Sequence, residues 1–366
     1  MTDGSRHRGS VARFLRTARE ITVGAPTSGG VPTAAAQIDG ANTSDAAFVG
    51  IASPGAPAAA VEVTSLVAYE RAFGSADGEL RRAVRLFFDN GGTRAFVVGA
   101  PGQLSDGLQV LDNVRFSILA IPDAAGLGPA DATALFVQAV ALCEERRAIA
   151  VVDPPATFGL PDALAWAPTL GAARDAAAYF PRLRLPDGTE TAASGAVVGV
   201  YARTDRERAV WKAPAGEAVR GVTDVTVSLT DREVSSANSA SLNVIRRQQG
   251  VRAWGARTLS SDPEWRYVNV RRFALFIERS VSDGLRWAAF EPNTETLWTV
   301  VRTQVEAFMH TLFRQGALEA VHEEDAYFVR CDRTTMTQDD IDNGRLVVVV
   351  GFAPLRPAEF VVVRVG

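Results

Sequence analysis

Short apolar runs alternate with amphipathic segments through the first half of the chain. The runs have the length of buried strands and lie at 45–52, 94–99, 116–123 and 148–155. The amphipathic segments carry apolar residues at helical spacing and lie at 64–74, 79–91 and 131–147. A strand, a helix and a further strand in succession predict a parallel crossover. We therefore expect an α/β layer whose strands are buried on both faces.

The second half of the chain mixes the same two patterns less regularly. Prolines interrupt 156–187, which predicts a broken helix and a connecting strand, whereas 194–214 is expected to be helical. Strand patterns dominate 222–259, with a short helix beginning at Asp231. The other expected elements are a strand and helix at 268–281, a strand at 286–290, a long helix at 293–315, and strands at 326–330, 346–352 and 360–365. The expected fold class is α/β (α+β), a mixed sheet flanked by helices, with terminal arms.

The final strand is unusually apolar for the end of a chain. It consists of Phe360, Val361, Val362, Val363, Arg364 and Val365. Such a strand requires a partner, because an unpaired apolar edge templates aggregation. Pro354 and Pro357 bracket a stiff, extended spacer in front of it. We expect this spacer to be a hinge that can carry the strand to the sheet of another subunit.

Four regions follow from these patterns. A chain of 366 residues is long enough for roughly two or three domains. Residues 1–44 are rich in small residues and arginine and are expected to form an N-terminal arm. The other expected regions are an α/β domain at 45–220, a C-terminal domain at 221–353 and a donor-strand arm at 354–366.

Composition and charge exclude several classes of partner. Hydrophobic residues make up 47% and charged residues 22%, as in ordinary globular proteins. A net charge of −4 gives no overall reason to bind nucleic acid or an anionic membrane, so we expect neither partner. No apolar run approaches the roughly 20 residues that cross a bilayer, and the first residues lack a secretory signal. We therefore expect assembly in the cytoplasm, with Cys143 and Cys331 as buried thiols.

Nucleotide-binding motifs are incomplete in this chain. Gly126 and Gly128 follow a predicted strand, but Asp131 stands where a dinucleotide site requires its third glycine. Lys212 is the only lysine and lies between Trp211 and Ala213, which excludes a phosphate-binding P-loop. An ordinary turn therefore explains the glycines best.

Two acidic clusters are also expected to be structural. One follows His322 in a loop, where adjacent side chains rarely converge on a metal and no second histidine lies at helical spacing. The other precedes a strand and is expected to cap a one-turn helix. The clusters are Glu323, Glu324 and Asp325, and Asp339, Asp340 and Asp342. We expect no catalytic, cofactor-binding or metal site.

Several long motifs occur together in the final third. They are VRAWGARTLSSDPEWRYVNVRRFALFIERSVSDGLRWAAFEPNTETLW from Val251, VEAFMHTLFRQGAL from Val305, CDRTTMTQDDIDNGRL from Cys331 and the closing PLRPAEFVVVRV. With them, this part of the chain resembles the sheath proteins of contractile phage tails and tail-like contractile injection systems. FFDNGGTRAFVV from Phe87, CEERRAIAVVDPP from Cys143 and GAVVGVYARTDRERAVWKAPAG from Gly195 also resemble that family. The likeness thus extends over most of 45–366.

The resemblance implies a structural subunit without enzymatic activity or cofactor. Such subunits form a homo-oligomer, a helical sheath of hexameric rings around an inner tube protein, and meet baseplate and cap or terminator proteins. The particle is a phage tail or a released tail-like particle. By the same resemblance, 45–220 would be a compact outer part and 221–353 an inner, tube-facing part. Contraction would be a cooperative shift between two lattices without a nucleotide.

The resemblance also implies roles for individual segments. Sheath subunits exchange terminal strands, so 360–365 would be donated to a neighbour. The acceptor edge would include Leu346, Val347, Val348, Val349 and Val350. The helix at 293–315 would lie toward the tube, with Arg302, Glu306 and Arg314 as possible contacts.

Two departures from the family pattern leave alternatives open. The N-terminal region lacks the usual start of a sheath protein, and 19–26 is the nearest candidate for an exchanged N-terminal strand. The chain also lacks room for the large outer insertions of many sheaths. A specialised sheath paralogue at the baseplate or terminal end is one alternative. An α/β enzyme whose sheet edge dimerises is the other, although histidine, lysine and cysteine are scarce.

Overall fold

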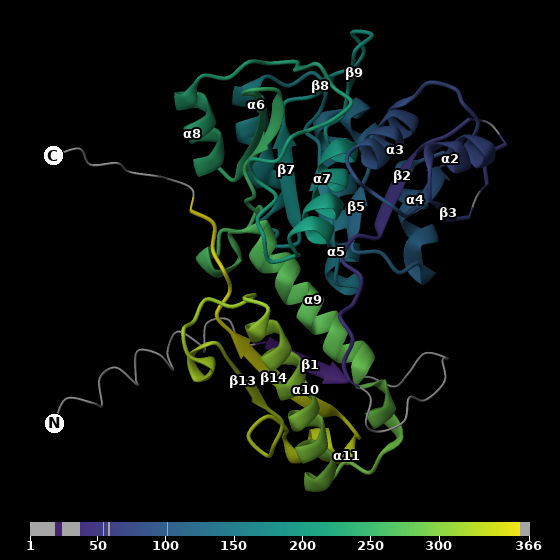
Figure 1. Cartoon of the computed structure of the whole chain (residues 1–366). Coiled ribbons are helices and arrows are strands. Elements are labelled where there is room, and N and C mark those ends of the chain that lie inside the picture. Colours follow the sequence, from purple (N-terminus) through teal and green to yellow (C-terminus); the bar gives the residue numbers. More distant parts are fainter. Residues whose placement is uncertain (1–18, 24–36, 54, 58, 101, 359–366) are drawn as a thin grey trace, which may run out of the picture. The chain divides into compact units, whose positions relative to one another are not determined.

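The computed structural model describes residues 19–23, 37–53, 55–57, 59–100 and 102–358 (Figure 1). The chain divides into two compact units, which are described separately. The small unit comprises Met1–Ala41 and Phe273–Arg356, and the large unit comprises Asn42–Arg272 and Pro357–Gly366. This division differs from the boundary expected after residue 220, because strands beyond that point complete the sheet of the large unit.

The large unit is built on an eight-stranded sheet in the order β12-β11-β7-β6-β5-β2-β4-β3. The six inner strands run parallel, and the two edge strands, β12 and β3, are antiparallel to their neighbours. The strands are β2 (Ala46–Ile51), β3 (Val61–Val63), β4 (Ala95–Ala100), β5 (Ile118–Ala120), β6 (Ile149–Val152), β7 (Ala176–Phe180), β11 (Leu242–Arg247) and β12 (Val251–Trp254). A second sheet joins β10 (Asp224–Val225), β8 (Leu183–Arg184) and β9 (Glu190–Thr191). The expected mixed sheet is confirmed.

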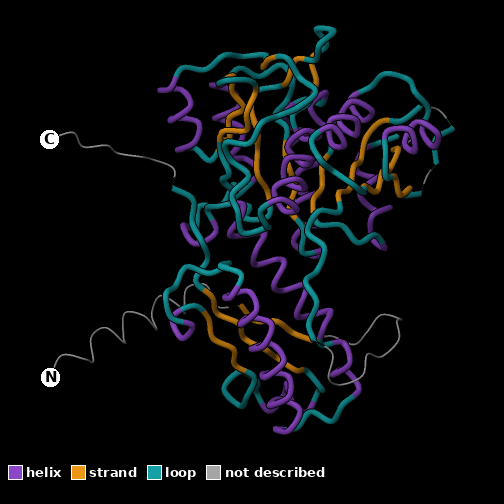
Figure 2. The backbone as a smooth tube through the Cα atoms, viewed as in Figure 1, coloured by secondary structure: helices purple, strands orange, loops and turns teal. Residues whose placement is uncertain are grey.

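Helices cover both faces of this sheet, as Figures 1 and 2 show. Phe48 and Val49 are neighbours on β2 and enter different hydrophobic cores, since successive strand residues point to opposite faces. The core that contains Phe48 packs against α2 (Leu66–Phe73), α3 (Glu79–Asp89) and α7 (Ser194–Glu207). The core that contains Val49 packs against α4 (Leu104–Val110), α5 (Pro129–Arg146), α6 (Leu160–Trp166) and α8 (Asp231–Ser239).

Two glycines let α7 approach α3 closely. A Cβ atom on Gly195 would lie 2.4 Å from the Cα atom of Ala83, and one on Gly199 would lie 2.5 Å from the carbonyl oxygen of Phe87. Real Cβ atoms do not come this near to backbone atoms, so both positions require glycine at the observed helix separation. The spacing of four residues places both glycines on one face of α7.

The small unit contains a three-stranded antiparallel sheet in the order β1-β14-β13. Its strands are β1 (Arg19–Val23), β13 (Tyr327–Arg330) and β14 (Leu346–Phe352), and its helices are α10 (Glu295–Arg314) and α11 (Gln338–Asp342). Helix α9 (Val268–Gly284) enters this unit at Phe273. The ring of Phe273 meets Phe352 of β14 at 5.4 Å, edge to face, so α9 packs on the sheet.

Two sequence predictions in this region are wrong. The segment 268–281 is helical throughout, and 286–290 forms a 3₁₀ turn (Arg286–Phe290) instead of a strand. Leu285, Trp287 and Ala288 are all buried, because the turn directs these apolar side chains inward. A short apolar run of this kind does not distinguish a strand from a buried helical turn.

Candidate assembly site

The sheet of the small unit joins the two ends of the sequence. β1 pairs with β14 from Arg19 opposite Val350 to Val23 opposite Leu346. On its other side, β14 pairs with β13 from Tyr327 opposite Phe352 to Arg330 opposite Val349. A segment of the expected N-terminal arm therefore forms backbone hydrogen bonds with the expected acceptor strand.

The expected acceptor residues do not lie at an edge of this sheet. The residues Leu346, Val347, Val348, Val349 and Val350 lie on the middle strand, and both of its sides are paired within this chain. They are therefore not an edge of this sheet, because β1 pairs with the side of β14 at which a donated strand was expected. Among the described residues, the outer sides of β1 and β13 carry no further strand. The expected donor strand, residues 360–365, lies outside the described residues.

Burial explains why β14 holds the central place. Val348, Val350 and Phe352 share one face of β14 and are buried there, and Val347 on the opposite face is also buried, which suits a strand in the middle of its sheet. Opposite Gly351, the ring of Phe328 on β13 lies where a Cβ atom of residue 351 would stand, 2.2 Å from its nearest ring atom. An aromatic ring over a strand glycine fills the missing side-chain volume. No pattern in the sequence predicts this cross-strand pair.

The expected hinge lies where the chain passes from one unit to the other. Pro354 forms a β-bridge with Leu318, and the backbone N–H of Glu319 donates to the carbonyl of Ala353 at 2.8 Å, so this proline is fixed in the small unit. Pro357 belongs to the large unit. The two prolines therefore stand on either side of the boundary, and their hinge role stays a prediction.

The three residues expected to contact a tube lie on α10 and at its end. Arg302 and Glu306 face each other one helical turn apart, with Nε and Oε1 at 3.9 Å. Arg314 is exposed in the last turn, where a cation suits the helix dipole. Exposed pairs of this kind contribute only about 0.3–0.5 kcal/mol, so they leave both side chains available to a partner. The contacts themselves stay predictions.

Near the end of α10, the acidic loop is more ordered than a solvated turn. Nδ1 of His310 lies 2.7 Å from Oε1 of Glu323, and the hydroxyl of Tyr327 donates to the same oxygen. These bonds hold the pKa of Glu323 below its usual value. The structure thus ties the loop after α10 to β13, and within the described part of the chain no three acidic, histidine or cysteine side chains converge as metal ligands.

The second acidic cluster and the cysteines agree with the sequence predictions. Thr337 caps α11, and the Asp340 carboxylate accepts its backbone N–H at 2.9 Å. The hydroxyl of Thr337 also donates to this carboxylate at 2.6 Å, and Arg345 donates to it at 2.7 Å. Together these bonds lower the pKa of Asp340 to about 2. Cys143 and Cys331 are buried free thiols. No described helix is long and apolar enough to cross a membrane.

In parallel α/β sheets, ligands usually bind at the carboxyl ends of the strands. Here that edge carries Asp123 after β5 and Asp153 after β6. Oδ2 of Asp123 accepts the backbone N–H of Ile51 at 3.0 Å, and Oδ1 of Asp153 accepts those of Ala193 and Ser194 at 2.8 and 3.0 Å. Burial raises the pKa of each carboxyl to about 6. Both groups therefore anchor local backbone.

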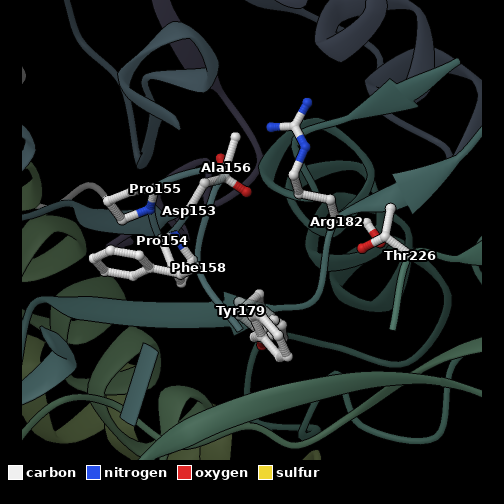
Figure 3. A pocket seen from close by; sticks show the side chains of 9 residues that line it. Asp153, Pro154, Pro155, Ala156, Phe158, Tyr179, Arg182 and Thr226 are labelled. Carbon is white, nitrogen blue, oxygen red and sulfur yellow. The ribbon is translucent and has the colours of Figure 1, made fainter. Parts of the chain in front are cut away.

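The space beside Asp153 is too small for a substrate. The cavity in Figure 3 has a volume of about 20 Å³, and Tyr179, Arg182 and Thr226 contribute to its walls. That volume suits about one water molecule. The Arg182 guanidinium forms an ion pair with Glu79 instead. Burial alone would raise the pKa of Glu79, but the charge of Arg182 and hydrogen bonds from Ala192, Arg182 and Thr191 outweigh it, so the pKa is lowered. This edge of the sheet is a structural network.

The small unit thus builds its sheet from segments far apart in the sequence, with β1 on one side of β14 and β13 on the other. Two family models match the chain: the phage tail sheath protein central domain at residues 99–259 and the phage tail sheath C-terminal domain at 260–366. The chain belongs to the phage tail sheath protein family, whose members are structural sheath proteins.

Individual relatives agree with this assignment. A putative prophage major tail sheath protein from Pseudomonas aeruginosa (strain UCBPP-PA14) is 29% identical over 60% of this chain and 57% of its own length. The chain thus matches little more than half of that relative. The helical sheath of the anti-feeding prophage in the contracted state is 30% identical, with a TM-score of 0.79 over 94% of this chain and 98% of its own. A chain of the six-fold symmetrised anti-feeding prophage baseplate is 28% identical, with a TM-score of 0.77 over 94% and 99%.

Proposed function

We propose that this protein is the sheath subunit of a contractile tail-like injection machine, and that copies stack as hexameric rings around an inner tube protein. The observation that carries the proposal is the pairing of β1 with β14. A strand that reaches a sheet through a terminal segment can form the same hydrogen bonds with another copy, as in domain swapping. The likeness to a contracted helical sheath supports the same role.

Strand exchange is the proposed link between copies. Both sides of β14 are occupied, so the strand from Phe360 to Val365 would add to the outer side of β1 or β13 of a neighbour. Backbone hydrogen bonds along an added strand supply affinity without needing a large apolar interface. Alternatively, β1 of one copy could pair with β14 of a neighbouring copy in the same register as it has here.

Contraction is the proposed movement of the assembled sheath. The two compact units would move nearly as rigid bodies, the contacts between copies would repack, and the exchanged strands would keep the lattice connected. The energy would come from the difference between two lattices, so no nucleotide is required. The proposed further partners are the inner tube, baseplate and cap or terminator proteins. The sheath would assemble in the cytoplasm. It would be a component of a phage tail or of a tail-like particle that is later released.

Electron microscopy of the purified protein tests the donor strand. We expect the full chain to form long sleeves, and a chain lacking residues 358–366 to stay folded without polymerising. Val362→Pro combined with Val363→Pro keeps the length of the arm but removes one backbone donor from each side of the strand, so it should also block sleeves. The matched control Val363→Ile keeps the β-branched side chain and should assemble normally. Sleeves of normal length from the deleted chain would refute the donor role.

A second candidate is a specialised sheath paralogue at one end of the sleeve. The likeness to a chain of the anti-feeding prophage baseplate favours it. Such a protein would form single rings, because its role is to join the sleeve to another component. The same micrographs separate the two candidates, since a sleeve subunit gives long tubes and an end protein gives isolated rings.

A further inference from the structure

A groove in the large unit lies where the described C-terminal residues end. Its volume is about 230 Å³, and its walls include Ala215, Trp254, Ala256, Tyr267, Pro357 and Ala358, all of them in the large unit. Ala256 is buried, whereas Trp254 and Tyr267 are half-buried and present aromatic surface. A cavity of about 150 Å³ already accepts a benzene ring, so this groove has room for an aromatic side chain.

The groove cannot accept a further strand beside β12. The outer side of β12 is already used, because the N–H of Gly216 donates to the carbonyl of Ala253 at 2.7 Å and the N–H of Ala253 donates to the carbonyl of Glu217 at 3.0 Å. An occupant therefore enters through its side chain and not through its backbone. An apolar or aromatic side chain suits these walls, which are mainly apolar and aromatic and include one amide side chain, that of Asn238.

The chain itself supplies such a side chain two residues beyond Ala358. An extended residue advances the backbone by at most about 3.6 Å, so the Cα atom of Phe360 lies within roughly 7 Å of that of Ala358. In an extended segment, alternate side chains share a face. Ala358 lines the groove, so an extended continuation of the chain would direct the side chain of Phe360, and not that of Glu359, to the same face.

We propose that the ring of Phe360 docks into this groove of its own subunit before assembly. Phe360 is the largest apolar residue of the terminal segment and the first residue of the proposed donor strand. Docking holds the start of that strand against the large unit and shields it from premature pairing with other chains. Only this consequence rests on the proposed sheath function, since the docking itself requires no second copy.

Hydrogen exchange measured by mass spectrometry tests the docking, at a dilution where light scattering shows single subunits. The full chain is compared with Phe360→Ala and with the control Val363→Ala, which changes the same arm without touching the docked ring. We expect Phe360→Ala to speed exchange at 214–219 and 251–256 by about fivefold to tenfold, as loss of a docked aromatic side chain predicts. Val363→Ala should leave both segments unchanged.

Three outcomes would overturn the proposal. If Phe360→Ala leaves the exchange rates at 214–219 and 251–256 unchanged, the ring does not occupy the groove. If Val363→Ala raises these rates as much as Phe360→Ala does, the groove does not bind the Phe360 ring specifically. Protection that disappears on further dilution shows that the ring comes from another copy. The sheath proposal is judged separately, by whether the full chain forms sleeves.

Discussion

Arg272 and Asp205 form a bidentate ion pair inside the large unit. The guanidinium donates to the two carboxylate oxygens at 2.8 and 2.6 Å, and the side chains are only 4% and 5% exposed. Arg272 also donates to the carbonyl of Thr43 at 2.9 Å and lies over the ring of Tyr201. This pair fixes the first turn of α9, whose residues up to Arg272 belong to the large unit.

Asp205→Ala should strongly destabilise the large unit. It leaves the Arg272 charge buried without its partner, which costs about 3–5 kcal/mol in comparable cases. Chemical denaturation followed by circular dichroism measures the free energy of unfolding. The control Glu190→Ala removes the exposed pair with Arg184 and should cost less than about 1 kcal/mol. If both variants lower the free energy of unfolding equally, the buried ion pair of Arg272 stabilises the protein no more than an exposed pair.

Gly199→Ala should separate α7 from α3. The added methyl would stand 2.5 Å from the Phe87 carbonyl oxygen and 2.6 Å from Cβ of Asn90, so one helix must shift. Overpacking of this kind costs about 1–3 kcal/mol, which thermal unfolding will detect. Gly126→Ala is the matched control, since a Cβ there meets no atom within 4 Å. A Gly199→Ala protein as stable as the control would contradict the close helix contact.

The stability of the large unit should depend on the charge of Asp153. Burial raises the folded-state pKa of this group to about 6, above its unfolded value. Its contribution is therefore fully present below about pH 4 and is lost as the pH rises through about 6. Asp153→Asn keeps an oxygen that can accept the N–H groups of Ala193 and Ser194, and it does not titrate.

Denaturation of both proteins between pH 4 and pH 8 measures this effect. From pH 4 to pH 7, the stability of the natural chain relative to Asp153→Asn should fall by about 3 kcal/mol, the equivalent of roughly two pKa units. Other titrating groups are common to both proteins and cancel in the difference. A difference that stays constant with pH would show that the carboxyl titrates normally.

Exchanging the charges of Arg302 and Glu306 tests whether they face a partner. Arg302→Glu with Glu306→Arg restores the pair on α10 with opposite polarity, so subunit stability should change by less than about 0.5 kcal/mol. If the pair contacts a tube, the exchange reverses the charges presented to that tube and should abolish sleeve formation around it. If electron microscopy shows normal numbers of sleeves around a tube, these two residues do not contribute to the interface with it.

Periodicity predicted the large unit well, because its strands are buried on both faces and its helices are long. The runs that became β2, β4, β5 and β6, and the helices α3 and α5, were placed within a few residues. The mixed sheet and the buried cysteines followed from the same patterns. The family resemblance was likewise available from the sequence, since its motifs are long and specific.

The candidate assembly site was predicted less completely, because its key relationships join distant parts of the sequence. The sequence indicates a candidate exchanged strand at 19–26, but periodicity does not reveal that residues 19–23 pair with β14. For the same reason, Leu346 to Val350 were expected at an edge. The contact of Phe328 with Gly351 and the groove beside Trp254 depend on side chains that the tertiary fold brings together.

A cryo-EM map of the assembled polymer would show directly whether strands are exchanged, because it traces the C-terminal segment from one copy to the next. We expect Phe360 to Val365 to form backbone hydrogen bonds with the β1-β14-β13 sheet of a neighbouring copy. A map in which this segment stays entirely on its own subunit, with no backbone contact to another copy, would contradict it.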